Sequence, residues 1–84
     1  MIYSIVIEKS AQKALAKIIP SMQNRIIDAI RLLGDNPRPT GVKKLTGREA
    51  WRIRIGDYRV IYEIQDTQLL IYVITIGHRK EVYR

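Results

Sequence analysis

Cysteine is absent from this chain of 84 residues, histidine occurs once, and no apolar run is long enough to span a bilayer. The absence of cysteine excludes a disulfide scaffold and a thiolate zinc site, and it suits a reducing compartment such as the cytoplasm. The sequence also shows no internal repeat, no low-complexity tail and no signal-like stretch after a basic segment. Its length predicts one domain over residues 1–84 with a small margin of stability.

Acidic residues are few relative to basic ones. Eight Asp and Glu stand against fifteen Lys and Arg, so the formal net charge is +7. On a small domain this excess indicates a polyanionic partner: nucleic acid, an acidic protein segment or an anionic membrane surface. The net charge is +3 for residues 1–42 (six basic, three acidic) and +4 for residues 43–84 (nine basic, five acidic), so it is not a basic tail.

The first half of the chain predicts a strand followed by a helical hairpin. Residues 2–7 are β-branched and aromatic, which is typical of a strand. Ser10 is expected to cap a short helix that ends near Ile18, and Pro20 separates it from a longer helix that ends at Gly34. The apolar stripe of the longer helix consists of Met22, Ile26, Ala29, Ile30 and Leu33.

The second half predicts three or four antiparallel strands. Residues 51–55 alternate strictly between apolar and basic side chains, which is typical of a half-buried strand. Gly56-Asp57 is a two-residue hairpin signal, and strands are expected at 58–64 and 69–76, with a further short one at 42–45. The fold class is therefore α+β, with the two helices packed on one antiparallel sheet.

The expected hairpin register separates apolar from basic side chains. If Gly56 and Asp57 form the turn, Arg54 pairs with Arg59, and Arg52 lies on the same face. The opposite, helix-facing side then carries Trp51, Ile53, Ile55, Tyr58, Val60 and Tyr62. Two arginines directly opposite each other repel, but a bound phosphate would convert that repulsion into a site. The alternative is that these arginines are ordinary solvated charges.

The end of the chain adds cations to this face. The segment Gly77-His78-Arg79-Lys80 follows the last strand, whose end should lie beside the strand that carries Arg59. Cations from three successive segments would then converge, which suits a phosphodiester. Histidine is the residue type whose ordinary pKa lies near neutrality, so His78 is a candidate acid, base or stacking group; the alternative is a surface residue at a strand end.

Three segments resemble the RelE/ParE toxin superfamily, on the RelE side. These are GDYRVIYEI, LLIYVITI and GHRKEVYR, and the resemblance extends over nearly the whole chain. It implies a RelE-like fold and a ribosome-dependent endonuclease that cleaves mRNA in the ribosomal A site. In this family the 2′-OH of the RNA attacks the adjacent phosphate without a metal or cofactor. The implied partners are a RelB-like antitoxin, the ribosome and mRNA, with operator DNA reached only through the antitoxin and no membrane partner.

The resemblance also implies catalytic positions. They are Arg52, Arg54, Arg59, Arg79 and Tyr83, with His78 inside the same C-terminal motif. The family pattern has lysine at the first two positions, and arginine keeps its proton, so neither Arg52 nor Arg54 serves as general base. The segment between Arg79 and Tyr83 is about two residues shorter than in the pattern. Tyr83 acts as base only if arginines lower its pKa; otherwise it stacks, donates a hydrogen bond or packs on the sheet.

Other basic residues are weaker candidates. Lys43, Lys44 and Lys80 are expected to bind the RNA backbone, with solvated lysines as the alternative. Lys9, Lys13 and Lys17 share one face of the first helix and either contact ribosomal RNA or are solvated. Glu49, Glu63 and Glu81 form no recognisable metal set, so no metal is expected.

Two further expectations concern apolar side chains. Trp51 is assigned to the core by its parity with Ile53. Leu70, Tyr72 and Ile74 point to the face expected to carry the arginines of residues 52–59 if Asp66-Thr67 form a two-residue turn, which would suit an antitoxin peptide.

Two other functions are also compatible with the sequence. A ParE-like toxin would inhibit DNA gyrase by binding, without cleaving anything. A basic binding module that has lost activity is the third interpretation, because arginine replaces lysine at residues 52 and 54.

Overall fold

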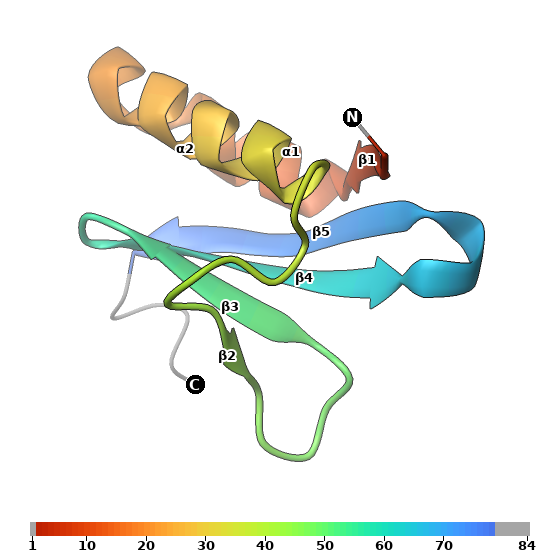
Figure 1. Cartoon of the computed structure of the whole chain (residues 1–84). Coiled ribbons are helices and arrows are strands. Elements are labelled where there is room, and N and C mark those ends of the chain that lie inside the picture. Colours follow the sequence, from red (N-terminus) through yellow and green to blue (C-terminus); the bar gives the residue numbers. More distant parts are fainter. Residues whose placement is uncertain (1, 79–84) are drawn as a thin grey trace.

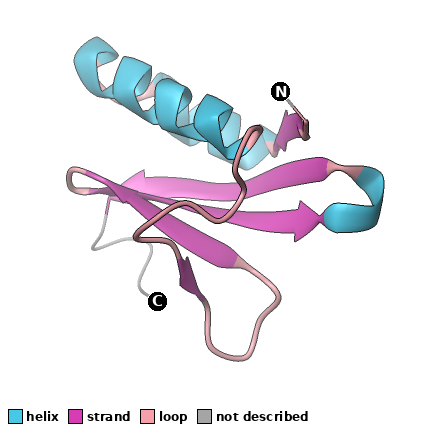
Figure 2. Ribbon diagram, viewed as in Figure 1, coloured by secondary structure: helices cyan, strands magenta, loops and turns pink. Residues whose placement is uncertain are grey.

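Two helices cover one face of a five-stranded sheet in the computed structural model, which describes residues 2–78 (Figure 1). The strand order across the sheet is β1-β5-β4-β3-β2. The other face carries no helix of the described residues (Figure 2). The elements are β1 (Ser4–Ile7), α1 (Lys9–Ala16), α2 (Pro20–Leu33), β2 (Lys43–Lys44), β3 (Trp51–Ile55), β4 (Tyr58–Gln65), the 3-10 turn η1 (Asp66–Gln68) and β5 (Leu70–His78). The predicted α+β arrangement is confirmed.

β1 departs from the antiparallel pattern expected for the sheet. It pairs in parallel with β5, from Ser4 opposite Leu70 to Ile7 opposite Val73. Parallel neighbours require a long crossover, which the two helices and the meander provide here. The sheet is therefore mixed, and its parallel edge depends on a pairing between opposite ends of the chain.

The start of α1 differs from the expectation. The helix begins at Lys9, and the residue before it, Glu8, forms no side-chain capping bond. The backbone N–H of Glu8 instead donates to the Val73 carbonyl at 2.8 Å, which continues the pairing of β1. The end of the strand therefore sets the start of the helix, and the prediction that Ser10 is the cap is wrong.

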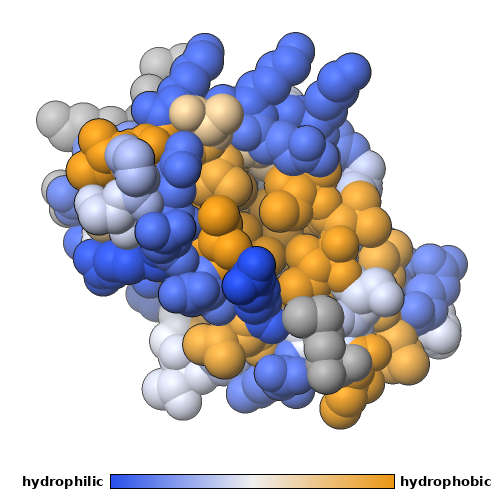
Figure 3. Space-filling model, turned by 90° about the horizontal axis from the view of Figure 1, so that it is seen from above, coloured by the Kyte–Doolittle hydropathy of each residue, from blue (hydrophilic) through white to orange (hydrophobic). Residues whose placement is uncertain are grey.

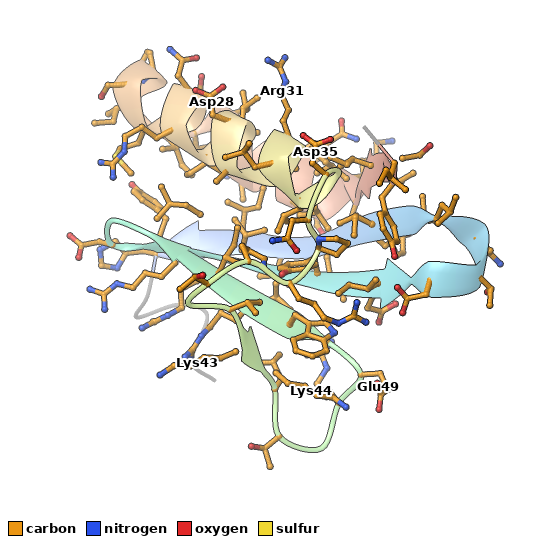
Figure 4. The ribbon with its side chains drawn as sticks, viewed as in Figure 1. Asp28, Arg31, Asp35, Lys43, Lys44 and Glu49 are labelled. Atoms are coloured by element: carbon orange, nitrogen blue, oxygen red, sulfur yellow. The ribbon has the colours of Figure 1, made fainter. Side chains whose placement is uncertain are left out.

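α2 follows its sequence pattern closely. Pro20 occupies the first turn, where its missing N–H costs no hydrogen bond, and Gly34 is the C-cap. The predicted apolar stripe faces the sheet: Ile26, Ile30 and Leu33 are buried, and Met22 and Ala29 pack against the core. On the solvent side, Asp28, Arg31 and Asp35 lie along the outside of the helix and the loop after it (Figure 4).

The β3–β4 hairpin has the predicted register. Trp51 lies opposite Tyr62, Arg54 opposite Arg59, and Ile55 opposite Tyr58. Gly56 in the turn has a φ of +60°, a conformation that glycine adopts without strain. Side chains facing the helices join the core cluster, namely Ile53, Ile55, Val60 and Tyr62, with Trp51 and Tyr58 packed against it.

The β4–β5 connection has the length left between the expected strands at 58–64 and 69–76, but it is longer than the two-residue Asp66-Thr67 turn on which the orientation of Leu70, Tyr72 and Ile74 depended. η1 and Leu69, which has a φ of +52°, form a four-residue loop, so Gln65 lies opposite Leu70. The two extra residues preserve the side-chain alternation, so Leu70 and Tyr72 lie on the side of the sheet that carries Arg59, as expected, whereas the register skips Ile74. A bulge then shifts the register between Ile61 and Tyr62.

Asp66 explains why this loop is not a two-residue turn. Its carboxylate accepts hydrogen bonds from the Tyr3 hydroxyl at 2.7 Å and from Arg38 Nη2 at 3.0 Å. These two hydrogen bonds hold the pKa of Asp66 below its ordinary value, and the bond from Arg38 has the larger effect. The loop is thus held by contacts with two segments distant in sequence. No helix among residues 2–78 has the length and apolar character needed to cross a membrane.

Tyr62 gives the fold a predicted dependence on alkaline pH. Its side chain is fully buried, its hydroxyl donates to the Pro37 carbonyl at 2.7 Å, and burial raises its pKa to about 12. In the unfolded chain a tyrosine loses its proton near pH ~10. Between these values the unfolded state releases a proton that the folded state keeps, so the free energy of unfolding falls as pH rises.

We expect Tyr62→Phe to reduce this fall while costing about 1 kcal/mol at neutral pH through the lost bond to Pro37. Urea unfolding of both proteins from about pH 9 to about pH 12 measures the difference. Tyr3 and Tyr72 also have raised pKa values and are present in both proteins, so they cancel in the comparison. Parallel stability curves for the two proteins would contradict the assignment to Tyr62.

Candidate active site

Three arginines share the face of the sheet opposite the helices. Arg54 lies directly across from Arg59, and Arg52 lies across from Ile61. Their alternation with the core residues Ile53 and Val60 places all three on this open side. We call Arg52, Arg54 and Arg59 the arginine face; the structure brings these predicted residues together.

The three side chains differ in exposure. Arg54 is exposed and Arg52 half-buried, whereas Arg59 is only 5% exposed. Arginine is rarely buried unless its charge is compensated, because transfer of a charge out of water is costly. A solvated surface charge therefore describes Arg54 but not Arg59, which is held in place within the face.

Arg54 is oriented by the hairpin turn. Its Nε donates to the Gly56 carbonyl at 2.9 Å, so the side chain folds back along the turn. The terminal nitrogens of the same guanidinium carry further N–H groups that can contact an anion. The turn thus supplies both the register of the arginine face and the orientation of one of its members.

The end of β5 lies beside Arg59, as predicted. Gly77 is the residue opposite Arg59, and His78 is opposite Tyr58. However, His78 makes an edge-to-face contact with Tyr58, with ring centroids 5.7 Å apart, and it borders a cavity together with Lys13 of α1. Its side chain therefore lies on the helix side of the sheet, away from the arginine face.

The bulge in β5 is the reason for this placement. At the start of β5, even-numbered residues share the face of Arg59, as Leu70 and Tyr72 do. The register shift between Ile61 and Tyr62 reverses this alternation, so Thr75 and Gly77 take that face instead. The other predicted C-terminal residues, Arg79, Lys80 and Tyr83, lie outside the described residues.

The two lysines of β2 differ from each other. Lys43 pairs with Arg52 and shares its side of the sheet, whereas Lys44 pairs with Trp51. Lys44 Nζ lies 3.2 Å from Glu49 Oε1, and Figure 4 shows the two side chains pointing toward each other. Lys43 extends the arginine face, while much of the charge of Lys44 is engaged by Glu49.

Trp51 packs against the core, as expected. Two cationic side chains also lie over its ring, which the sequence did not indicate. Arg38 lies 5.1 Å and Lys44 5.8 Å from the centre of its ring. Arg38 also forms the ion pair with Asp66. No local signal could have found this group, because 28 residues separate Arg38 from Asp66 along the chain.

The arginine face can bind phosphate oxygens and stabilise negative charge that develops on them. It cannot accept a proton through its guanidinium groups, because arginine remains charged. Within residues 2–78, no three His, Asp or Glu side chains are grouped in a way that could hold a metal ion. The geometry therefore indicates an anion site in which arginine supplies binding and charge stabilisation.

Comparisons with known proteins agree with this fold. Residues 5–83 match the family model described as the ParE toxin of the type II toxin–antitoxin system parDE. A toxin RelE1 from Methanocaldococcus jannaschii is 31% identical, over 100% of this chain and 98% of that protein. Toxin RelG from Mycobacterium tuberculosis is 28% identical, over 100% and 99%.

A solved structure is also similar over almost its full length. The archaeal RelE–RelB complex from Pyrococcus horikoshii contains a chain that is 30% identical with a TM-score of 0.85. The match covers 94% of the present chain and 97% of that one.

Proposed function

Because this chain belongs to the RelE/ParE toxin superfamily of type II toxin–antitoxin systems, we propose that it is a ribosome-dependent endonuclease that cleaves mRNA in the ribosomal A site. The observation that carries the proposal is the arginine face. Its three members occupy positions implied by the resemblance to RelE toxins, and one of them, Arg59, is buried rather than solvated. Because Arg59 is held within the face directly across from Arg54 and does not extend into water, its position supports a preorganised role in phosphate binding rather than in solubility.

The proposed reaction is an internal transesterification of RNA. The 2′-OH loses a proton as its oxygen bonds to the adjacent phosphorus, and the bond to the 5′-oxygen breaks as that oxygen gains a proton. Arg54 and Arg59 would contact the non-bridging phosphate oxygens, whose negative charge increases in the transition state. Arg52 and Lys43 would hold the flanking backbone.

Proton transfer falls to a different group. Of the two predicted candidates, His78 lies on the helix side of the sheet. We therefore propose Tyr83 as the group that accepts the 2′-OH proton, and the 5′-oxygen takes its proton from water. Arg79 and Lys80 stay predictions for the same site.

The proposed inhibitor is a RelB-like antitoxin. A similar archaeal RelE has been crystallised with RelB. In this chain, apolar side chains gather on the helix-side surface (Figure 3), and Leu32 of α2 is 66% exposed. A cavity of about 670 Å³ adjoins Leu32 and is bordered by Pro39, Ile53 and Ile55. Such apolar surface supports binding of a protein chain, and operator DNA would be contacted through the antitoxin.

Purified toxin and ribosomes programmed with a defined mRNA test the proposal. We expect a cut within the codon in the A site and no cut of the same mRNA without ribosomes. A message that stays intact in the A site would contradict the endonuclease assignment.

A second candidate is inhibition of DNA gyrase, because the matching family model is that of ParE. A supercoiling assay with purified gyrase separates the two functions. The endonuclease is expected to leave supercoiling unchanged, whereas a ParE-like toxin would inhibit it.

A further inference from the structure

We propose that the cavity between α1 and the adjoining ends of β4 and β5 binds a nucleotide. This cavity has a volume of about 490 Å³ and lies on the helix side of the sheet, so it is distinct from the arginine face. Its size falls within the range of about 300–1,000 Å³ that is common for small-ligand sites. The groups that matter for binding are Ser10, Lys13, Lys17, Tyr58, Ile76 and His78.

One wall of this nucleotide pocket is cationic. Lys13 of α1 and Lys17, the C-cap residue of that helix, are four residues apart, so they lie on the same side about one turn from each other. Neither forms an ion pair with a carboxylate of the described residues. Ser10, about one turn before Lys13, borders the same cavity. A phosphate between the two ammonium groups would gain charge-assisted hydrogen bonds from both.

The opposite wall is aromatic and apolar. Tyr58 and His78 meet edge to face, with ring planes at 83° to each other, and Ile76 lies beside them. Flat rings with apolar neighbours suit stacking of a nucleobase, which contributes about 1–3 kcal/mol per base where it has been measured. A free phosphate would use only the lysines, whereas a nucleotide uses both walls.

The helix that carries the lysines is fixed to its surroundings. Gln12 Nε2 donates to the Ile7 carbonyl at 2.8 Å, and Gln23 Nε2 of α2 donates to the Leu15 carbonyl at 2.9 Å. These bonds hold α1 to β1 and to α2. The backbone that carries the lysines is therefore fixed before a ligand binds, which lowers the entropy cost of binding.

The ligand chemistry is that of a nucleotide, either free or within an RNA strand. The inference does not rest on the proposed endonuclease activity, because the pocket and the arginine face lie on opposite sides of the sheet. Binding at the pocket can therefore be tested even if the chain cleaves nothing.

NMR titration of the full chain tests the proposal, with uridine 5′-monophosphate, a uridine tetranucleotide and inorganic phosphate as probes. We expect saturable shifts of the His78 ring and of the amides of Ser10 and Lys17 with both nucleotide probes. Phosphate alone should bind more weakly. Equal affinity for the two nucleotide probes would identify the free nucleotide as ligand, and tighter binding of the tetranucleotide would identify RNA.

Charge-reversal variants test the role of the two lysines, and one of these variants is a matched control. Lys13→Glu and Lys17→Glu should each weaken nucleotide binding by about tenfold or more. Lys9→Glu makes the same change on the same helix but outside the pocket lining, and should change the affinity less than about twofold. These lysines are exposed, so the variants should keep the wild-type melting temperature.

Three results would overturn the proposal. They are the absence of saturable shifts, equal weakening by Lys9→Glu, and equal affinity for phosphate and uridine 5′-monophosphate. The second would indicate general attraction to a basic surface, and the third would show that the base is not recognised.

Discussion

Arg59→Gln is expected to lower the rate of ribosome-dependent mRNA cleavage by about 100-fold or more. The guanidinium of Arg59 is buried on the arginine face, directly across from Arg54. A preorganised donor of this kind contributes most where negative charge develops, and removal of one such donor costs about 100- to 1,000-fold in other enzymes. Arg59→Lys keeps the positive charge but loses the planar guanidinium group with its paired N–H donors. Its cleavage rate should therefore lie between those of the wild type and Arg59→Gln.

Single-turnover cleavage on programmed ribosomes measures this effect. Arg31→Gln is the matched control, because Arg31 lies on the solvent side of α2, away from the arginine face (Figure 4), and this variant should cleave at the wild-type rate. Arg54→Gln gives a second test with an exposed side chain, so that loss of activity there is not a consequence of altered burial.

Melting curves accompany both measurements, since replacement of a buried arginine also changes stability. A folded Arg59→Gln protein that cleaves as fast as wild type would contradict the role of this face in catalysis. If that protein also remained equally toxic in cells, the non-catalytic binding module would become the better interpretation.

Ile26→Ala is expected to lower the free energy of unfolding by about 3 kcal/mol. Ile26 is fully buried on the stripe of α2 that packs against the sheet. Removal of its three outer carbon atoms loses the free energy of their burial and leaves a cavity, which together cost about 2–5 kcal/mol in comparable cores. A domain of this length has a total free energy of unfolding of about 4–13 kcal/mol, so this substitution would remove a large fraction of it.

Urea unfolding at neutral pH measures this loss. Leu32→Ala is the control on the same helix, because Leu32 is 66% exposed and its truncation should change stability by less than about 0.5 kcal/mol. Equal losses for the two variants would mean that α2 does not bury its Ile26 stripe against the sheet as described.

Local sequence patterns were sufficient for much of the fold and for the arginine face. The 3- and 4-residue spacing of Ile26, Ile30 and Leu33 requires only helix geometry, and it identified the buried stripe of α2. A two-residue turn allows only one pairing register between the two strands that it connects. The turn at Gly56-Asp57 therefore places Arg54 opposite Arg59. Neither inference needs information from distant parts of the chain.

Other features depend on partners far away in sequence. The direction of β1 comes from its pairing with β5, and the start of α1 comes from the bond between Glu8 and Val73. The ion pair of Arg38 with Asp66 likewise joins segments that no periodicity connects. The alternation of apolar and polar residues along a strand is the same in both directions. It therefore does not indicate whether two strands pair in parallel or antiparallel, or which distant segments meet.

The sequence alone determined which side chains could form an anion site. It also determined that three arginines share a face, because the tight turn after the first two fixes the pairing of the strands. Only the tertiary structure decided which of them is buried and which residues join them. Side-chain alternation has a period of two, so the single bulge between Ile61 and Tyr62 reverses the side on which later residues of β5 lie. That one-residue shift moves His78 from the face of Arg59 to the pocket beside α1.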